Sequence, residues 1–174
     1  MTATLWERLD EALIDAFTAE MGVPGDYDPE TDTPDPLWVE AFETGDTWNP
    51  DKGPFPALLL LSDSADIDPG QHGAPVGAVE LSYPYMVVAV AELTTYAAAR
   101  SAAQTMGFRI RQTLSKWPAI LAAAHVSGTQ ETPQVLMLRR ARIEVRGRQG
   151  SNRGRYLGIA VVQFSVDATE RGDD

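Results

Sequence analysis

The sequence contains no cysteine among its 174 residues and only two histidines, His72 and His125. The absence of cysteine excludes disulfide bonds, thiol nucleophiles and cysteine-based zinc sites, and it fits a reducing compartment. No apolar run approaches the roughly 20 residues that a membrane-spanning helix needs. Residues 2–20 are amphipathic and acidic, unlike an export signal. We therefore expect a soluble, cytoplasmic chain without membrane partners.

Basic residues are scarce in the first half of the chain. Residues 1–80 contain 18 Asp and Glu but only Arg8 and Lys52 as basic residues, whereas residues 81–174 contain seven acidic and twelve basic residues. The two halves therefore carry formal charges of −16 and +5. This asymmetry indicates either complementary faces, within the fold or between copies, or a solvated acidic loop region beside a basic sheet edge.

Two helices are predicted from apolar periodicity. The first follows Thr4, which forms a T-x-x-E capping box with Glu7, and ends before Gly22 and Pro24. Residues 95–117 form the longest helix, and Pro118 interrupts it or starts a short second helix through Ala124. One face of the longest helix is apolar: Tyr96, Ala99, Ala103, Met106, Ile110, Leu114 and Trp117.

Strands account for most of the rest. Residues 22–56 are rich in proline and acidic residues and read as a loop or insertion, with a short helical turn predicted from Pro36. Strands are predicted at 57–61, 76–82 and 83–91, and a C-terminal β-hairpin at 135–146 and 155–168. Strict alternation would place Leu136, Leu138, Arg140 and Arg142 on one face of the hairpin. We expect a single domain over 1–174 with a frayed tail at 169–174.

This grouping of elements predicts an α+β fold. Because the strands do not alternate strictly with helices, the sheet should be mostly antiparallel. The long helix and the N-terminal helix should pack on one face of it.

No arrangement of residues indicates catalysis. The phosphate-binding GxxxxGK[ST] and GxGxxG patterns are absent, and Ser151 stands one place too early for a GxSxG nucleophile elbow. We interpret both histidines as surface or packing residues, because a useful base needs a positioned partner. The sequence therefore predicts a protein that is not an enzyme and that has no cofactor.

Two acidic clusters are candidates for a metal site: Asp26, Asp28, Glu30 and Asp32, and Asp63, Asp66 and Asp68 with His72. The first lacks the glycine and the twelfth-position glutamate of a calcium loop, and the second has the wrong spacing. We interpret both as solvated loops and predict no metal site. The alternative function is a small metal-responsive binding or regulatory module that uses the Asp63–His72 loop.

Arginine is concentrated in the hairpin, with only Glu144 as an opposing charge inside the run. The planar guanidinium group suits carboxylates and phosphates. Three interpretations remain open: a charged edge that prevents aggregation, pairing with the acidic half within or between subunits, and contact with nucleic acid. The candidate interface residues are Arg139, Arg140, Arg142, Arg146, Arg148, Arg153 and Arg155.

The element order resembles a known family. An acidic N-terminal helix is followed by the strand Tyr85–Val90, a long Ala-rich helix, and a hairpin whose return strand reads GRYLGIAVVQFSV over Gly154–Val166. This is similar to the tail terminator (tail completion) proteins of long-tailed bacteriophages, and more loosely to the related head–tail joining proteins. The resemblance covers residues 57–168.

The resemblance implies a structural virion protein of the bacteriophage tail, assembled in the host cytoplasm. It implies a hexameric ring of identical subunits that caps the tail-tube protein and offers a docking face to the head connector protein. DNA would pass through the lumen without specific recognition. The family has no catalytic residues to carry over, and residues 22–56 are longer than the family needs.

Overall fold

The computed structural model describes residues 3–21, 38–42, 55–62, 66–68, 78–150 and 153–171. The elements follow in this order: α1 (Leu5–Met21), β1 (Trp38–Phe42), β2 (Ala57–Ser62), β3 (Asp66–Asp68), β4 (Ala78–Leu93), α2 (Tyr96–Leu114), α3 (Trp117–Ala124), β5 (Glu131–Gly147) and β6 (Tyr156–Arg171). None of the described helices is long and apolar enough to cross a membrane.

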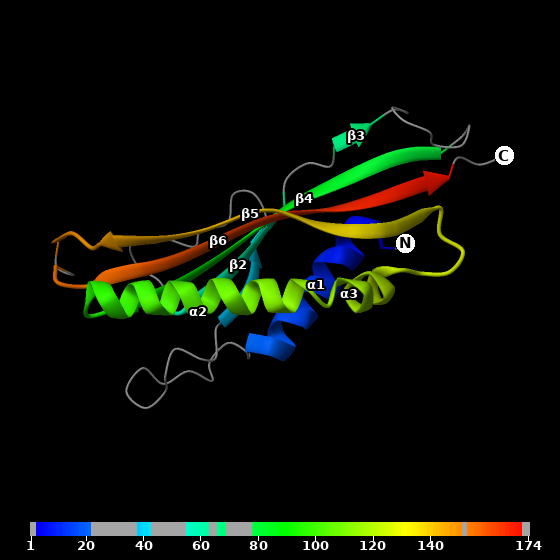
Figure 1. The fold of residues 1–174 in the computed structure, drawn as a ribbon. Helices are drawn as coiled ribbons and strands as arrows, with labels where there is room; N and C mark the ends of the chain where they lie inside the picture. The colour runs from blue at the N-terminus through cyan, green and yellow to red at the C-terminus, as the bar shows by residue number, and fades with distance from the viewer. Residues whose placement is uncertain are drawn as a thin grey trace.

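The strands form one sheet in the order β1-β2-β4-β6-β5, with β3 also paired to β4. The β1–β2 pair is parallel and every other pair is antiparallel. The labelled helices all lie on the same side of the sheet, with α2 running along the three long strands (Figure 1). The expected α+β fold, with a mostly antiparallel sheet and a C-terminal hairpin, is confirmed.

The predicted capping box opens α1. The Thr4 backbone N–H donates to Glu7 Oε2 at 2.7 Å, and the Glu7 backbone N–H donates to Thr4 Oγ1 at 3.2 Å. Another N–H group of the first turn, that of Leu5, donates to Oε2 of the distant Glu131 at 3.0 Å. Local sequence and tertiary structure therefore both satisfy the free N–H groups at the start of this helix.

Glu131 also touches Tyr83, whose hydroxyl donates to Glu131 Oε1 at 3.3 Å. Burial and the negative charge of Glu131 raise the pKa of Tyr83 from 10.0 to about 12. The folded chain therefore holds the phenol proton more tightly than the unfolded chain does. The resulting stability is complete below pH 10.0 and is lost as the pH rises towards about 12.

We expect the free energy of unfolding to fall more steeply above pH 10.0 in the wild type than in Tyr83→Phe. Urea denaturation at a series of alkaline pH values measures both slopes. Equal slopes would contradict the pKa assignment to Tyr83.

The core lies between the sheet and the helices. Leu5, Leu9, Leu13 and Phe17 form the buried stripe of α1. On the sheet, the rings of Tyr85 and Phe164 stack at a centroid distance of 5.3 Å. On α2, the buried positions are Ala99, Ala102, Ala103, Met106, Ile110, Thr113 and Leu114.

Close contact between α2 and β6 depends on Gly158. A Cβ atom at Gly158 would lie 2.1 Å from the carbonyl oxygen of Ala99 and 2.9 Å from its carbonyl carbon. Both are backbone atoms, which have no freedom to rotate away. The first turn of α2 therefore rests directly on the β6 backbone.

Several boundaries differ from the sequence predictions. The C-terminal tail was expected to fray from residue 169, but β6 continues to Arg171 because these residues pair with β4. Trp38–Phe42 is a strand and not part of a helical turn, because it pairs with β2 in a register that local sequence does not reveal. The two strands predicted at 76–91 are one strand, β4, with Pro84 inside it. The long helix ends at Leu114, and Pro118 is the second residue of the separate helix α3, where its missing N–H costs nothing.

The faces of β5 were also predicted wrongly beyond its midpoint. The register with β6 shifts between Leu138 and Arg140, which makes Arg139 a bulge. Leu138 pairs with the core residue Phe164, yet Ile143 pairs with the core residue Ala160. Because a bulge adds one residue to the strand, the even-numbered Leu136 and Leu138 face the helices before Arg139, and odd-numbered positions face them after it.

Candidate interaction surface

The seven arginines identified in the sequence occupy β5, the 147–155 connection and the residues just before β6. The structure does not bring them together as one cluster. It divides them into a tip group near the turn of the hairpin, Arg146, Arg148, Arg153 and Arg155, and an edge group on the exposed edge of the sheet. The two groups have different chemistry and are described in turn.

Glu92 forms ion pairs with two arginines of the tip group. Arg148 forms an ion pair with Glu92 Oε2, and Arg155 Nη1 lies 3.1 Å from Glu92 Oε1. The side chains of Arg148 and Glu92 are only 7% and 16% exposed. The Arg148 guanidinium also lies over the ring of Phe55, 5.4 Å from the centroid. Arg148 and Arg155 therefore anchor the hairpin to the end of β4.

Arg146 and Arg153 are more exposed. Arg146 forms an ion pair with Glu144 on the same strand, and the hydrogen bond from Arg146 lowers the pKa of the Glu144 carboxyl. The Arg153 backbone N–H donates to the Gly150 carbonyl oxygen at 3.3 Å. Gly150 and Gly154 have φ angles of 73° and 90°, a region that favours glycine. Glycine thus permits the turn that displays Arg153 to solvent.

The edge group consists of Arg139, Arg140 and Arg142. All three lie in the stretch 137–143, where every residue of β5 is exposed. Arg140 and Arg142 border a hollow of about 70 Å³ with Val161 and Gln163. These residues lie on the face of the sheet opposite the helices, called here the distal face, since Arg142 is in register with Val161 and not with a core residue of the helix side.

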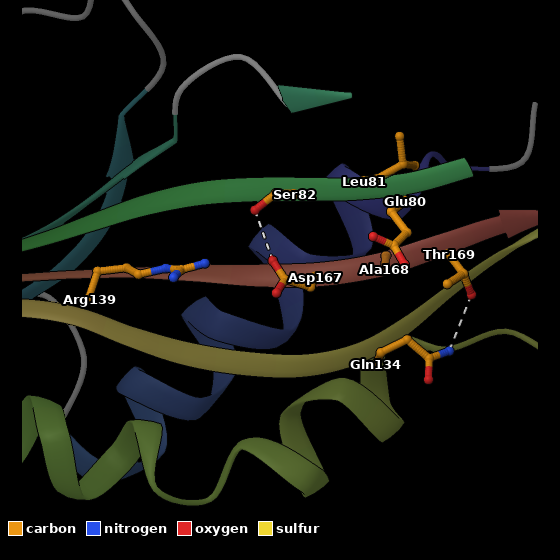
Figure 2. A pocket seen from close by; sticks show the side chains of 8 residues that line it. All are labelled: Glu80, Leu81, Ser82, Gln134, Arg139, Asp167, Ala168 and Thr169. Carbon is orange, nitrogen blue, oxygen red and sulfur yellow. Dashed lines mark hydrogen bonds between the residues drawn. The ribbon is translucent and has the colours of Figure 1, made fainter. Parts of the chain in front are cut away.

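A larger recess of about 370 Å³ lies where β4, β6 and β5 continue past Arg139. In Figure 2 the Arg139 side chain extends along the strands toward Asp167. Arg139 Nε donates to Ser165 Oγ at 3.0 Å, and Ser82 Oγ donates to Asp167 Oδ1 at 2.8 Å. The lining residues are Glu80, Leu81, Ser82, Gln134, Arg139, Asp167, Ala168 and Thr169.

The recess is lined by hydrogen-bond donors and acceptors, among them the positively charged Arg139 and the negatively charged Glu80 and Asp167. It has no histidine or lysine among its lining residues to serve as a base for a hydroxyl nucleophile. Among the described residues, no group of three or more His, Cys, Asp or Glu is placed to hold a metal ion. The recess presents charged and polar side chains for hydrogen bonding.

The acidic clusters considered in the sequence fall mostly outside the described residues. This applies to the whole 26–32 cluster, and to Asp63 and His72 of the second. Only the backbone of Asp66–Asp68 is described, as β3 on the edge of β4. His125 is exposed and directly follows α3. Ser151 also lies outside the described residues.

One of the three interpretations pairs these arginines with the acidic half, within or between subunits. The ion pairs seen among the described residues join Arg146 to Glu144, and Arg148 and Arg155 to Glu92, and both carboxylates belong to residues 81–174. An ion pair between the two halves that the described residues do form, Lys116–Glu20, uses no arginine of the hairpin.

No protein-family model matches this sequence, and the search of curated proteins finds no significant match. The site must therefore be interpreted from its own geometry. Sequence reasoning missed Glu92 and Phe55, which both contact Arg148. A signal for Glu92 was present, because it is the single acidic residue in the otherwise apolar run 83–93.

Proposed function

We propose that this chain is a structural virion subunit resembling a phage tail terminator, which forms a ring that caps the tail tube and joins it to the head connector. The observation that carries the proposal is the exposed, arginine-bearing edge of β5 in a chain whose first half has a formal charge of −16. The confirmed α+β fold, with helices on one face and a C-terminal hairpin, supports the resemblance.

The charge distribution suits a ring for a physical reason. A closed ring of identical subunits is built from heterologous contacts, so each subunit needs two different and complementary patches. Arg140 and Arg142 are exposed on one edge, while most acidic residues lie elsewhere in the chain. Opposite charges on different patches also favour head-to-tail contacts over contacts between like patches.

In this proposal the protein acts without catalysis, metal or cofactor. Its partners are further copies of itself, the tail-tube protein on one side of the ring and the head connector protein on the other. DNA passes through the lumen and is not recognised by sequence. The ring is assembled in the host cytoplasm and becomes part of the virion tail.

Native mass spectrometry over a concentration series tests the ring. We expect a discrete six-copy species whose fraction grows with concentration. Adding the tail-tube protein should increase that fraction, because the tube end presents a template. A chain that stays monomeric both alone and with the tube protein would contradict the proposed function.

A charge-reversal pair tests which arginines matter. We expect Arg140→Glu with Arg142→Glu to abolish the six-copy species and to leave the circular dichroism spectrum and the unfolding midpoint nearly unchanged, because both side chains are exposed. The matched control is Arg100→Glu with Arg111→Glu, which makes the same charge change at exposed positions of α2. Equal loss of assembly in both double variants would show that total charge, and not the β5 edge, controls assembly.

A further inference from the structure

Each end of the sheet has an edge strand with one side that no described strand pairs. Among the described residues, β1 pairs only with β2, and β5 pairs only with β6. The outer edges of β1 and β5 therefore present backbone N–H and C=O groups that these pairings do not use. Such edges pair readily with another strand.

The β5 edge has features of an interface and not only of a protected edge. Arginines alone would suffice to repel other strands. However, the exposed stretch 137–143 also contains Met137, Leu138 and Ile143, whose exposed fractions are 41%, 51% and 41%. Large apolar side chains next to exposed backbone groups indicate a surface that a partner covers.

One row of the sheet connects the two edges. Glu40 on β1 is in register with Leu59, Leu59 with Val88, Val88 with Val161, and Val161 with Arg142. This row crosses all five strands of the main path. It begins at an acidic position on one edge and ends at a basic position on the other.

The strand directions are also compatible with continuation of the sheet. β1 is parallel to β2, and the next three pairings are antiparallel. A second copy in the same orientation would therefore bring its β1 antiparallel to β5. With five residues, β1 is short enough to pair within the exposed stretch 137–143.

We propose that neighbouring copies join edge to edge, with β1 of one copy hydrogen-bonded to residues 137–143 of β5 in the next, so that their sheets become continuous. This inference rests on the proposed ring and names its interface. The contact is heterologous, so repeating it closes a ring when the rotation between neighbouring copies divides a full turn evenly. It brings the acidic position 40 of one copy to the basic positions 140 and 142 of the next.

The competing symmetric contact, β5 against β5, is disfavoured by charge. It would bring the arginines at 139, 140 and 142 of one copy close to the same arginines of its partner. Like charges on facing strands are destabilising, and a two-fold contact of this kind ends at a dimer. The β1 edge belongs to the acidic half and avoids this repulsion.

Crosslinking through introduced cysteines tests the interface, and the chain has no cysteine of its own to interfere. Full-length Glu40→Cys is mixed with a size-tagged Arg142→Cys chain, or with a tagged Arg140→Cys chain, and treated with a short bis-maleimide. The control mixes Glu40→Cys with tagged Gln112→Cys, an exposed position on α2. We expect the 40–140 or 40–142 product to exceed the 40–112 product at least tenfold.

The outcomes separate the interface from the proposed function. A six-copy species in native mass spectrometry without selective 40–140 or 40–142 product would overturn the edge-to-edge inference and leave the ring. Selective product without a six-copy species would support the interface and count against the ring. Absence of both would overturn both. A charge exchange adds a second measurement: Glu40→Arg should restore assembly to Arg142→Glu, and failure to restore it would count against this contact.

Discussion

Replacing Gly158 by alanine should destabilise the folded chain by about 3 kcal/mol, because the added methyl group has no room. Its Cβ would lie 2.1 Å from the carbonyl oxygen of Ala99, and both atoms belong to packed backbones. Either α2 must move away from β6, which opens the core along Ala99 and Ala103, or β6 must distort within the sheet. Chemical denaturation followed by circular dichroism measures the loss.

Gly107 provides the matched control for Gly158. It lies in α2, and a Cβ there would be 3.5 Å from Ala160 Cβ and 3.8 Å from Ile143 Cγ2, which is ordinary van der Waals contact. Alanine also favours a helix interior over glycine by about 0.5–1 kcal/mol. We therefore expect Gly107→Ala to leave stability unchanged or to increase it. Similar losses in both variants would contradict the close approach of α2 to β6.

The second large effect is expected at Glu92. Glu92→Gln removes the negative charge that faces Arg148 and Arg155 while it keeps the size of the side chain. Because Arg148 and Glu92 are both largely buried, the Arg148 guanidinium cannot fully recover its hydration in the variant. We therefore expect the free energy of unfolding to fall by about 2 kcal/mol. The hairpin tip should also become more sensitive to limited proteolysis in the 147–155 connection.

Glu144→Gln is the control for that experiment. It removes a carboxylate from another arginine pair of the same hairpin, but Arg146 is solvent-exposed and can be hydrated instead. We expect no measurable change in the urea midpoint or in the proteolysis rate. Equal behaviour of the two variants would show that the Arg148–Glu92 contact contributes nothing to the hairpin anchor.

The arginines of the hairpin have two different roles: some stabilise the fold through Glu92, and others are exposed on the surface. Charge reversal at Arg148 or Arg155 would damage the fold near Glu92 as well as any interface, so a loss of assembly in such variants would be ambiguous. Arg140, Arg142 and Arg153 are exposed and are the better positions for interface tests. The sequence located all the arginines, but it did not show which of them the fold uses internally.

The sequence alone determined the elements that depend on near neighbours. The capping box of Thr4 and Glu7 and the apolar stripe of α1 are set by residues three and four positions apart. The hairpin follows from alternation within each strand, and the α+β class follows from the order of the elements. Absence of cysteine excluded thiol chemistry without any structure.

Tertiary structure decided what depends on distant partners. Trp38–Phe42 became a strand because β2 pairs with it, and Arg139 became a bulge because β6 imposes the register of β5. Glu92 meets Arg148 only when β4 and the hairpin lie side by side. Periodicity is a property of one segment, whereas register, burial of a charge and close approach at Gly158 are properties of two, so they emerged only from the folded chain.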